Sequence, residues 1–232
     1  MDKKTTSKKV LVVSAHPDDE VLGCGGTILK HVSRNDQVVL LTLSNGVSSR
    51  NLSNSVLEKE IQLRKQALVQ ACTILGIDKY LQLDFPDNSF DSVSLIEIIQ
   101  AIEKLIAEFQ PTIVYTHFCG DLNVDHQLTH KAVITACRTQ PKSCVKEIYS
   151  YEVLSATNYI SASMQPQFCP NYYVDISSYI DKKITALKAY DMEMRTFPHA
   201  RSYEAIKALS IFRGTSVGLM AAEAFVVEKI ID

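Results

Sequence analysis

Short apolar runs alternate along the chain with longer segments in which apolar residues recur every three or four positions. The short runs predict β-strands, and the longer segments predict helices that each turn one face toward a sheet. One face of the segment 56–75 is formed in this way by Leu57, Ile61, Leu68, Cys72 and Leu75. The alternation of strand and helix is typical of an α/β protein with a mainly parallel sheet.

The predicted elements follow from these patterns and from the residues that end them. Strands are expected at Lys9–Ser14, Gln37–Leu43, Lys79–Leu83 and Thr112–Thr116, with weaker patterns at Ile148–Val153, Tyr172–Ile176 and Ala224–Lys229. Helices are expected at Gly25–Ser33, Val56–Leu75, Ser92–Phe109, His126–Arg138, Ser178–Asp191 and Ser202–Phe212, three of them stopped by Gly76, Pro111 and Gly214. We therefore expect a Rossmann-like α/β fold, with a mainly parallel sheet flanked by helices, as a single domain over 1–232 with a flexible N-terminus at 1–8.

Charge and composition indicate which classes of molecule this protein binds. The chain has 232 residues, 46% of them hydrophobic, and 24 Lys and Arg against 26 Asp and Glu. No run of five or six like charges occurs, which disfavours electrostatic binding of nucleic acid or anionic lipid. No segment approaches the roughly 18 uninterrupted apolar residues of a membrane span. We expect a small-molecule substrate, no nucleic acid and no integral membrane segment.

Cysteine usage and the start of the chain indicate a cytoplasmic protein. The six cysteines are scattered without a Cys-x-x-Cys pair, and a chain of this size does not need disulfides. The opening MDKKTTSKK is polar and lacks the apolar core of a signal peptide. Reduced thiols in a cytoplasm are the simplest expectation.

Two loops that follow predicted strands are rich in residues that bind metals. AHPDDE follows the first strand, and THFCGDLNVDH begins at the end of the fourth. In open parallel sheets, ligands bind beyond the carboxyl ends of the strands. The two loops share this edge if strands one and four are neighbours, as in the common doubly wound order.

These loops hold the ligands that a catalytic zinc requires. Such a zinc takes three protein ligands and keeps one position open for water. His16 and Asp19 could supply two ligands, on a turn stiffened by Pro17, and His126 or another residue of the second loop could supply the third. Asp18 is then left over, placed beside the water as a general base for hydrolysis of an amide or ester.

Each part of this pattern also has a structural explanation. Asp and Pro are common turn formers, so HPDD could be an ordinary loop. His126 could be a structural residue at a helix start, with Asp125 as the N-cap. The presence of two ligand-rich loops at one sheet edge favours the metal site.

Gly23, Gly25 and Gly26 also invite comparison with a dinucleotide-binding loop, which the spacing disfavours. That fingerprint is G-x-G-x-x-G directly after the strand, with an acidic residue at the end of the next strand. Here the spacing is G-x-G-G, eight residues intervene after Ser14, and the second strand ends in LTLSNG. We expect these glycines to let a helix pack tightly under the metal loop.

Three motifs together resemble the LmbE-like (PIG-L) family of zinc-dependent N-deacetylases. They are AHPDDEVLGCGGTI, THFCGDLNVDH and the late segment MRTFPHARSYEAIKALSIFRGTSVGLMAAEAF. The resemblance runs through nearly the whole chain, and its most specific part is the A-H-P-D-D-E block paired with D-H in the second loop. Members of this family remove acetyl groups from N-acetylglucosamine units joined to inositol, lipids, antibiotics or thiol precursors.

The resemblance implies a role for each residue of the two loops. It makes His16, Asp19 and His126 the zinc ligands and Asp18 the general base. Glu20 would orient a ligand or the neighbouring backbone, unless it is a solvent-exposed turn carboxylate.

The resemblance also suggests residues that hold sugar hydroxyls. Arg64 and Asp87 are the nearest matches to an arginine and an acid that do so in the family. The alternatives are a solvated arginine on a helix and an ordinary Asp-Asn-Ser turn.

One position departs from some members of the family. They carry a histidine three positions before the zinc histidine, thought to stabilise the oxyanion, where this chain has Asn123. Its amide can donate a hydrogen bond to an oxyanion but cannot give up a proton. We therefore expect Asp18 to return its proton to the leaving amine, and Asp125 to support His126 or another histidine. His117 and His130 are further candidates near the zinc; the alternatives are a strand-end residue and a residue one turn along the helix from His126.

The late segment contains three more basic candidates. His199 and Arg201, and less so Arg213, could contact an anionic part of the substrate such as a phosphate or carboxylate. Alternatively, Arg201 and Arg213 pair with Glu204 or Glu223 and hold the C-terminal part together.

The leading expectation is a metal-dependent hydrolase that removes the N-acetyl group from an N-acetylglucosamine-type amino sugar or its conjugate. The cofactor would be Zn2+, although two histidines and a carboxylate also suit Fe2+. Two alternatives stay open: an amidase on a related conjugate, and a non-catalytic carbohydrate-binding protein of the same fold. Family members commonly assemble, so a homo-oligomer is also expected.

Overall fold

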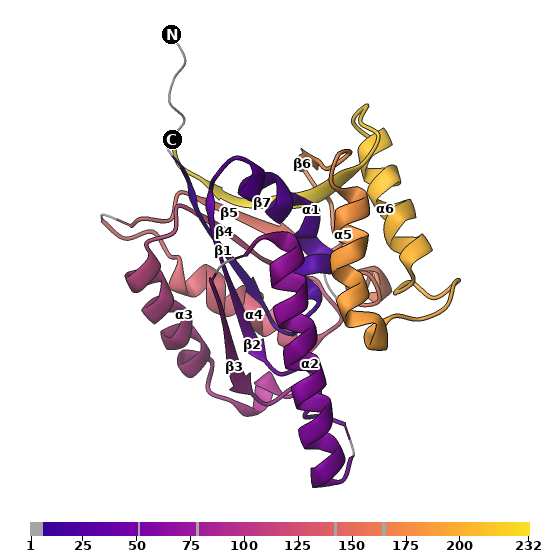
Figure 1. Cartoon of the computed structure of the whole chain (residues 1–232). Coiled ribbons are helices and arrows are strands. Elements are labelled where there is room, and N and C mark those ends of the chain that lie inside the picture. Colours follow the sequence, from indigo (N-terminus) through magenta and orange to yellow (C-terminus); the bar gives the residue numbers. More distant parts are fainter. Residues whose placement is uncertain (1–6, 51, 78, 142, 164–165) are drawn as a thin grey trace.

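The computed structural model describes residues 7–50, 52–77, 79–141, 143–163 and 166–232. Within these ranges seven strands form one sheet in the order β3-β2-β1-β4-β5-β7-β6 (Figure 1). Strands β1 to β5 run parallel in this sheet, and β7 is antiparallel to both of its neighbours. The bounds are β1 Lys9–Ser14, β2 Gln37–Ser44, β3 Lys79–Phe85, β4 Ile113–His117, β5 Glu147–Tyr151, β6 Tyr172–Asp175 and β7 Ala222–Ile230.

Helices cover both faces of the sheet (Figure 1). They are α1 Asp19–Ser33, α2 Asn54–Leu75, α3 Leu95–Phe109, α4 Val124–Ala136, α5 Ile180–Leu187 and α6 Tyr203–Thr215, with short 3-10 turns η1 Phe90–Ser92, η2 Thr157–Tyr159 and η3 Lys188–Glu193. Val10 and Val12 of β1 pack in the core with α1, α2 and α5, whereas Leu11 and Val13 pack with α3 and α4. Both faces of strand β1 are thus covered by helices, which explains why its residues are apolar at successive positions.

The predicted Rossmann-like α/β fold with a mainly parallel sheet is confirmed, including the three weaker strands. Of the expected flexible N-terminus at 1–8, residues 1–6 lie outside the described ranges. Most element boundaries differ from the predictions by only a few residues. Helix α4 begins at Val124 and has Asn123 as its N-cap, so the alternative in which Asp125 caps this helix is wrong.

The start of the first helix is the larger correction. Helix α1 begins at Asp19 rather than Gly25 and has a break at Cys24, where φ is −145°. A side chain at Gly23 would place its Cβ 2.2 Å from a ring carbon of Tyr151, and one at Gly26 would place it 2.7 Å from Ile176. These glycines therefore lie inside the helix, where they allow it to approach the sheet closely.

The last helix also departs from the prediction. Gly214 lies inside α6 rather than after its end, and the helix reaches Thr215. A Cβ at Gly214 would lie 2.7 Å from the backbone of Ala221. This glycine permits a close approach of two chain segments and does not stop the helix.

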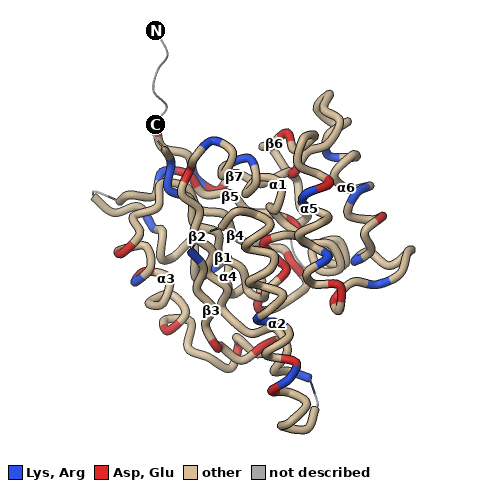
Figure 2. Tube along the Cα trace, viewed as in Figure 1, with Lys and Arg blue, Asp and Glu red and all other residues tan. Residues whose placement is uncertain are grey.

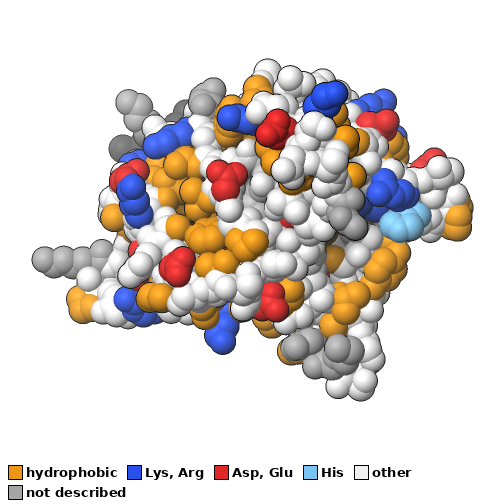
Figure 3. Space-filling model, turned by 90° about the horizontal axis from the view of Figure 1, so that it is seen from below, with side chains coloured by type: hydrophobic (Ala, Val, Ile, Leu, Met, Phe, Trp, Pro, Cys, Tyr) orange, Lys and Arg blue, Asp and Glu red, His pale blue; other side chains and the backbone are white. Residues whose placement is uncertain are grey.

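The carboxyl ends of the parallel strands lie on one side of the molecule. In Figure 1 the arrow of β3 points to the lower side, which Figure 3 shows face-on with charged and hydrophobic side chains intermixed. Along the described trace, Lys and Arg are interspersed with Asp and Glu (Figure 2). Within the described ranges, no helix is both long and apolar enough to cross a membrane.

Candidate metal centre and active site

The loops that follow β1 and β4 meet because these two strands are hydrogen-bonded neighbours. His16 and Asp19 come from the first loop and the start of α1, and His126 comes from the first turn of α4. His16 Nδ1 lies 3.3 Å from Asp19 Oδ2 and 3.3 Å from His126 Nε2, and the third separation, from His126 Nε2 to Asp19 Oδ2, is 3.4 Å. The three residues are buried and could hold a metal ion.

These separations match a tetrahedral zinc site. With bonds to nitrogen and oxygen of about 2.0–2.1 Å, tetrahedral ligand atoms lie about 3.3–3.4 Å apart. The other carboxylate oxygen of Asp19, Oδ1, is buried without a hydrogen-bond partner among the described residues. Two imidazoles and one carboxylate also form a donor set that zinc accepts. The residues present therefore fit a zinc ion.

Each candidate histidine ligand is backed by its own aspartate. His16 Nε2 lies 3.0 Å from Asp125 Oδ2, which leaves Nδ1 to face the centre. His126 Nδ1 lies 3.2 Å from Asp121 Oδ2. Carboxylates in such positions orient metal-binding imidazoles and raise their basicity. The sequence-based hypothesis included Asp125 but missed Asp121, for which the only signal was an aspartate within the second loop.

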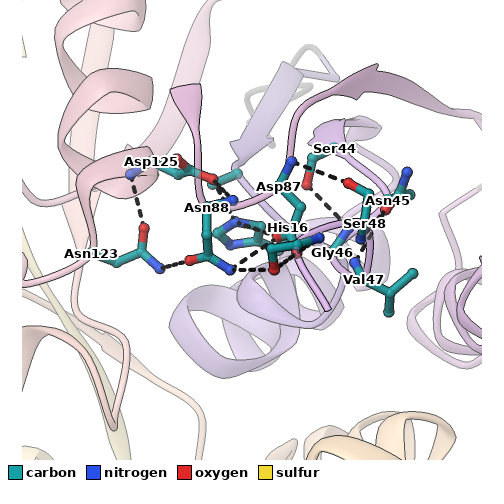
Figure 4. A network of polar contacts seen from close by, with 12 residues as sticks. His16, Ser44, Asn45, Gly46, Val47, Ser48, Asp87, Asn88, Asn123 and Asp125 are labelled. Carbon is teal, nitrogen blue, oxygen red and sulfur yellow. Dashed lines mark hydrogen bonds and ion pairs between the residues drawn. The ribbon is translucent and has the colours of Figure 1, made fainter. Parts of the chain in front are cut away.

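Asp125 also ties the loop after β3 to the centre (Figure 4). Its carboxylate accepts hydrogen bonds from the backbone N–H groups of Asn88, at 2.6 Å, and Phe90, at 2.9 Å. Asp87 Oδ1 lies 3.3 Å from His16 Nε2, and Asp87 Oδ2 accepts a hydrogen bond from the Ser49 hydroxyl at 2.5 Å. Three loops of the carboxyl edge thus converge on His16.

The electrostatics of this cluster favour a bound cation. Burial by itself lowers the pKa of His126, but Asp19 and Asp121 outweigh it and raise the pKa to about 10. Burial likewise opposes the effect of Asp125 and Asp19 on His16, whose pKa is raised to about 9. Burial would raise the pKa of Asp19, yet His126 and His117 hold it well below its usual value. The carboxylates therefore stabilise positive charge at the centre.

His117 lies beside the cluster, but its Nε2 already has a partner. This nitrogen accepts a hydrogen bond from the backbone N–H of Ala15 at 2.9 Å, and the ring stacks on His126 with centroids 3.9 Å apart. Burial, and then the proximity of His126, lower the pKa of His117 to about 4. His130 is turned away and donates from Nδ1 to the backbone carbonyl of His117 at 2.9 Å. His117 thus lies next to the candidate ligands, with its Nε2 3.4 Å from Asp19 Oδ2.

Asp18 lies next to the three candidate ligands in an unusual backbone conformation, with φ 106°. Its N–H donates to Glu20 Oε2 at 3.0 Å, and the other oxygen of Glu20 accepts from the Tyr190 hydroxyl at 2.7 Å. Glu20 is fully buried, so the alternative of an exposed turn carboxylate is wrong. Burial raises the pKa of Asp18, while Arg64 and Arg201 act to lower it.

Arg64 and Arg201 both reach Asp18. Each guanidinium lies 3.2 Å from Asp18 Oδ2. Arg64 is 2% exposed, which rules out the alternative of a solvated helix arginine, and it also contacts Glu193 Oε1 at 2.9 Å and donates to the carbonyl of Pro17. The alternative in which Arg201 pairs with Glu204 or Glu223 is therefore wrong.

A pocket of about 360 Å³ opens beside these residues. Its lining includes Asp18, Asn123, Arg64, Asp87 and Arg201 from the sequence-based hypothesis. Residues on its wall that the sequence-based hypothesis missed include Ser49, Arg50, Asn88, Ser155 and Glu193. They come from the loops after β2, β3 and β5 and from η3, and they carried no local motif.

Asn123 lines the pocket, whereas His199 and Arg213 lie outside it. Asn123 Oδ1 accepts from the N–H of Asp125 at 2.8 Å, and its Nδ2 donates to Asn88 Oδ1 at 3.1 Å. His199 is exposed, does not line the pocket, and accepts from the N–H of Arg201 at 3.0 Å. Arg213 forms two contacts with Glu152, at 2.7 and 2.8 Å, so the alternative in which it pairs with Glu204 or Glu223 is wrong.

The fold and these contacts define a Rossmann-like α/β protein with a buried His/Asp group that could hold a metal at the carboxyl edge of its sheet. The PIG-L family, described as GlcNAc-PI de-N-acetylase, matches residues 11–137. The match covers more than half of the chain, and this chain belongs to the PIG-L (LmbE-like) family of deacetylases.

Similar proteins agree with this assignment. The probable N-acetyl-alpha-D-glucosaminyl L-malate deacetylase 2 of Bacillus anthracis is 30% identical over 193 residues, which cover 82% of this chain and 83% of the relative. The N,N'-diacetylchitobiose deacetylase of Pyrococcus horikoshii superposes with a TM-score of 0.77 at 20% identity, over 96% of this chain and 84% of that chain.

One similar structure has a different reaction in its name. GalB, the 4-carboxy-2-hydroxymuconate hydratase of Pseudomonas putida KT2440, has a TM-score of 0.77 at 19% identity, over 97% of this chain and 98% of that chain. The shared fold therefore does not decide the reaction, which must be argued from the site.

Proposed function

We propose that this chain removes the N-acetyl group from an N-acetylglucosamine-type amino sugar or its conjugate in a zinc-dependent hydrolysis. The observation that carries the proposal is the triangle of His16, Asp19 and His126, with sides of 3.3 to 3.4 Å and the carboxylate of Asp18 beside it. The names of the Bacillus anthracis and Pyrococcus horikoshii relatives support deacetylation over hydration.

His16, Asp19 and His126 would hold the zinc ion. When bound, zinc supplies Lewis acidity, which lowers the pKa of water and polarises the carbonyl of the acetamide. Asp125 and Asp121 orient the two imidazoles from behind, so that one nitrogen of each faces the centre.

Asp18 would act as the general base and then as the general acid. It takes a proton from the attacking water and returns this proton to the nitrogen of the leaving amine. Burial raises the pKa of Asp18, which favours a carboxyl group that both accepts and releases a proton. Asn123 lines the pocket and would donate a hydrogen bond from its amide to the oxyanion, without supplying a proton.

The pocket wall would bind the sugar. Asp87 accepts hydrogen bonds and would hold a sugar hydroxyl, as expected from the sequence. Arg64 and Arg201, also expected to bind substrate, already contact Asp18, and His199 lies outside the pocket.

Two substitutions test the mechanism. Asp18→Asn should retain zinc and lose turnover, because the ligands stay and the base is removed. Asp19→Ala should lose the metal, because one of the three candidate ligands is removed. Acetate release from a panel of N-acetylglucosamine conjugates gives turnover, and elemental analysis gives zinc content. Full activity of Asp18→Asn would refute the mechanism, and wild-type protein that binds no metal would favour a non-catalytic carbohydrate-binding protein.

A further inference from the structure

The segment between η3 and α6 reaches into the centre from the C-terminal part of the chain. Arg201 of this segment places Nη1 3.2 Å from Asp18 Oδ2, where Nη2 of Arg64 also lies at 3.2 Å. The other oxygen, Oδ1, has no hydrogen-bond partner within the described part of the chain, and Asp18 lines the pocket. Two guanidinium groups therefore hold one oxygen, and the second stays available.

Arg201 is itself held in place by neighbouring groups. Its Nε donates to the Ser155 hydroxyl at 2.9 Å, and its backbone N–H donates to His199 Nδ1 at 3.0 Å. Its carbonyl accepts from the N–H of Arg195 at 2.9 Å. Contacts on the side chain and on both sides of the backbone give the guanidinium a defined position.

The backbone of Asp18 needs such support. Its φ of 106° lies in a region that residues with a side chain rarely adopt, so neighbouring groups must hold it. Glu20 accepts from the N–H of Asp18 and from the hydroxyl of Tyr190 in η3. Tyr190 and Arg201 thus both act on Asp18 from a part of the chain that lies beyond the family match at 11–137.

We propose that Arg201, together with Arg64, is a positioning residue that holds the general base Asp18 with Oδ1 turned to the reacting water. This inference rests on the proposed function, since it requires Asp18 to act as the base. It differs from the expectation that Arg201 binds an anionic part of the substrate.

The physical reason is the precision that proton transfer requires. A carboxylate free to rotate samples many orientations, and a misplacement of about 1 Å can lower a rate about 100-fold. Loss of Arg201 should therefore lower kcat about 10- to 100-fold and leave KM within about 2-fold. A residue that binds an anionic substrate group would instead raise KM.

The experiment compares Arg201→Gln, Arg201→Lys and Arg213→Gln with the wild type. Arg213→Gln is the matched control, because its ion pair with Glu152 has similar exposure, 17% against 20% for the arginine side chains, and lies off the pocket. The measurements are kcat and KM for an N-acetylglucosamine conjugate that the wild type deacetylates, together with zinc affinity by chelator competition. Arg201→Gln should lose kcat alone, Arg201→Lys should recover part of it, and the control should match the wild type.

The other outcomes are distinguishable. A raised KM with unchanged kcat in Arg201→Gln would overturn the inference in favour of substrate binding. A loss of zinc affinity, or an equal loss of kcat in Arg213→Gln, would overturn it in favour of a general structural role. If the wild type deacetylates no conjugate, the proposed function fails, and the inference fails with it.

Discussion

Asp125 is the residue whose substitution most directly tests the support of a candidate metal ligand. Its carboxylate is fully buried and accepts three hydrogen bonds, from His16 Nε2 at 3.0 Å and from the N–H groups of Asn88 at 2.6 Å and Phe90 at 2.9 Å. In Asp125→Asn, the new amide keeps one accepting oxygen and loses the negative charge. One or more of the three donors then has no acceptor, at about 1–3 kcal/mol for each.

The effect on zinc affinity follows from the contact with His16. A change in the carboxylate behind a metal-binding histidine weakens affinity about 10- to 100-fold. This range corresponds to about 1.4–2.8 kcal/mol, at about 1.4 kcal/mol for each factor of ten. We therefore expect Asp125→Asn to fold, with a lower unfolding midpoint, and to bind zinc at least about 10-fold more weakly than the wild type.

A competition titration against a chromophoric chelator gives the zinc dissociation constant of metal-free protein. Asp84→Asn serves as the control, because Asp84 is an exposed carboxylate on β3 and its loss changes the net charge equally. Unchanged zinc affinity in Asp125→Asn would refute the role assigned to the contact with His16. An equal loss in the control would show that net charge, rather than this contact, determines affinity.

Three further predictions concern folding. Gly23→Ala should lower the unfolding free energy by about 1–3 kcal/mol in urea titrations, because the new Cβ would lie 2.2 Å from the buried Tyr151 ring. An unchanged urea midpoint would contradict the close packing of α1 against Tyr151. Glu223→Gln should lower the unfolding free energy by about 3–5 kcal/mol, because the buried Lys183 ammonium, which lies 2.7 Å from Glu223 Oε1, loses its counter-charge. Adding Lys183→Met should recover much of this free energy, and no recovery would contradict the reasoning. Burial lowers the pKa of His31, so the stabilisation from this residue is present above its unfolded pKa near 6.5 and is lost as the pH falls through the folded pKa. In urea titrations at pH 7.5 and 5, His31→Gln should lose less unfolding free energy at the lower pH than the wild type does. An equal loss in both proteins would contradict this role of His31.

Several elements of the fold could be predicted because their signals are local. The apolar run at 10–13 indicated a strand, and its successive residues Val12 and Val13 pack on opposite sides of the sheet. The meeting of His16 and His126 required one more step, the pairing of β1 with β4, which the doubly wound order predicted. The candidate metal ligands were therefore accessible to sequence reasoning.

The start of α1 was mispredicted because the whole charged block was assigned to the loop after the first strand. Asp19 and Glu20 are buried and form the first helical turn, where negative charge is favoured by the helix dipole. Their side chains find partners in His126 and Tyr190, which lie far away along the chain. Nothing in the local pattern distinguishes a buried, partnered carboxylate from a solvated one.

The sequence by itself determined the strands, most of the helices and the candidate metal ligands, because periodicity and ligand type are properties of short segments. Only the tertiary structure decided which aspartate backs which histidine, that Arg64 and Arg201 hold Asp18, and that Arg213 belongs to a different ion pair. These contacts join residues from separate loops, up to 183 positions apart for Arg201 and Asp18. Burial and charge pairing are set by the path of the whole chain, so a local pattern could indicate the residues of the site but not their partners.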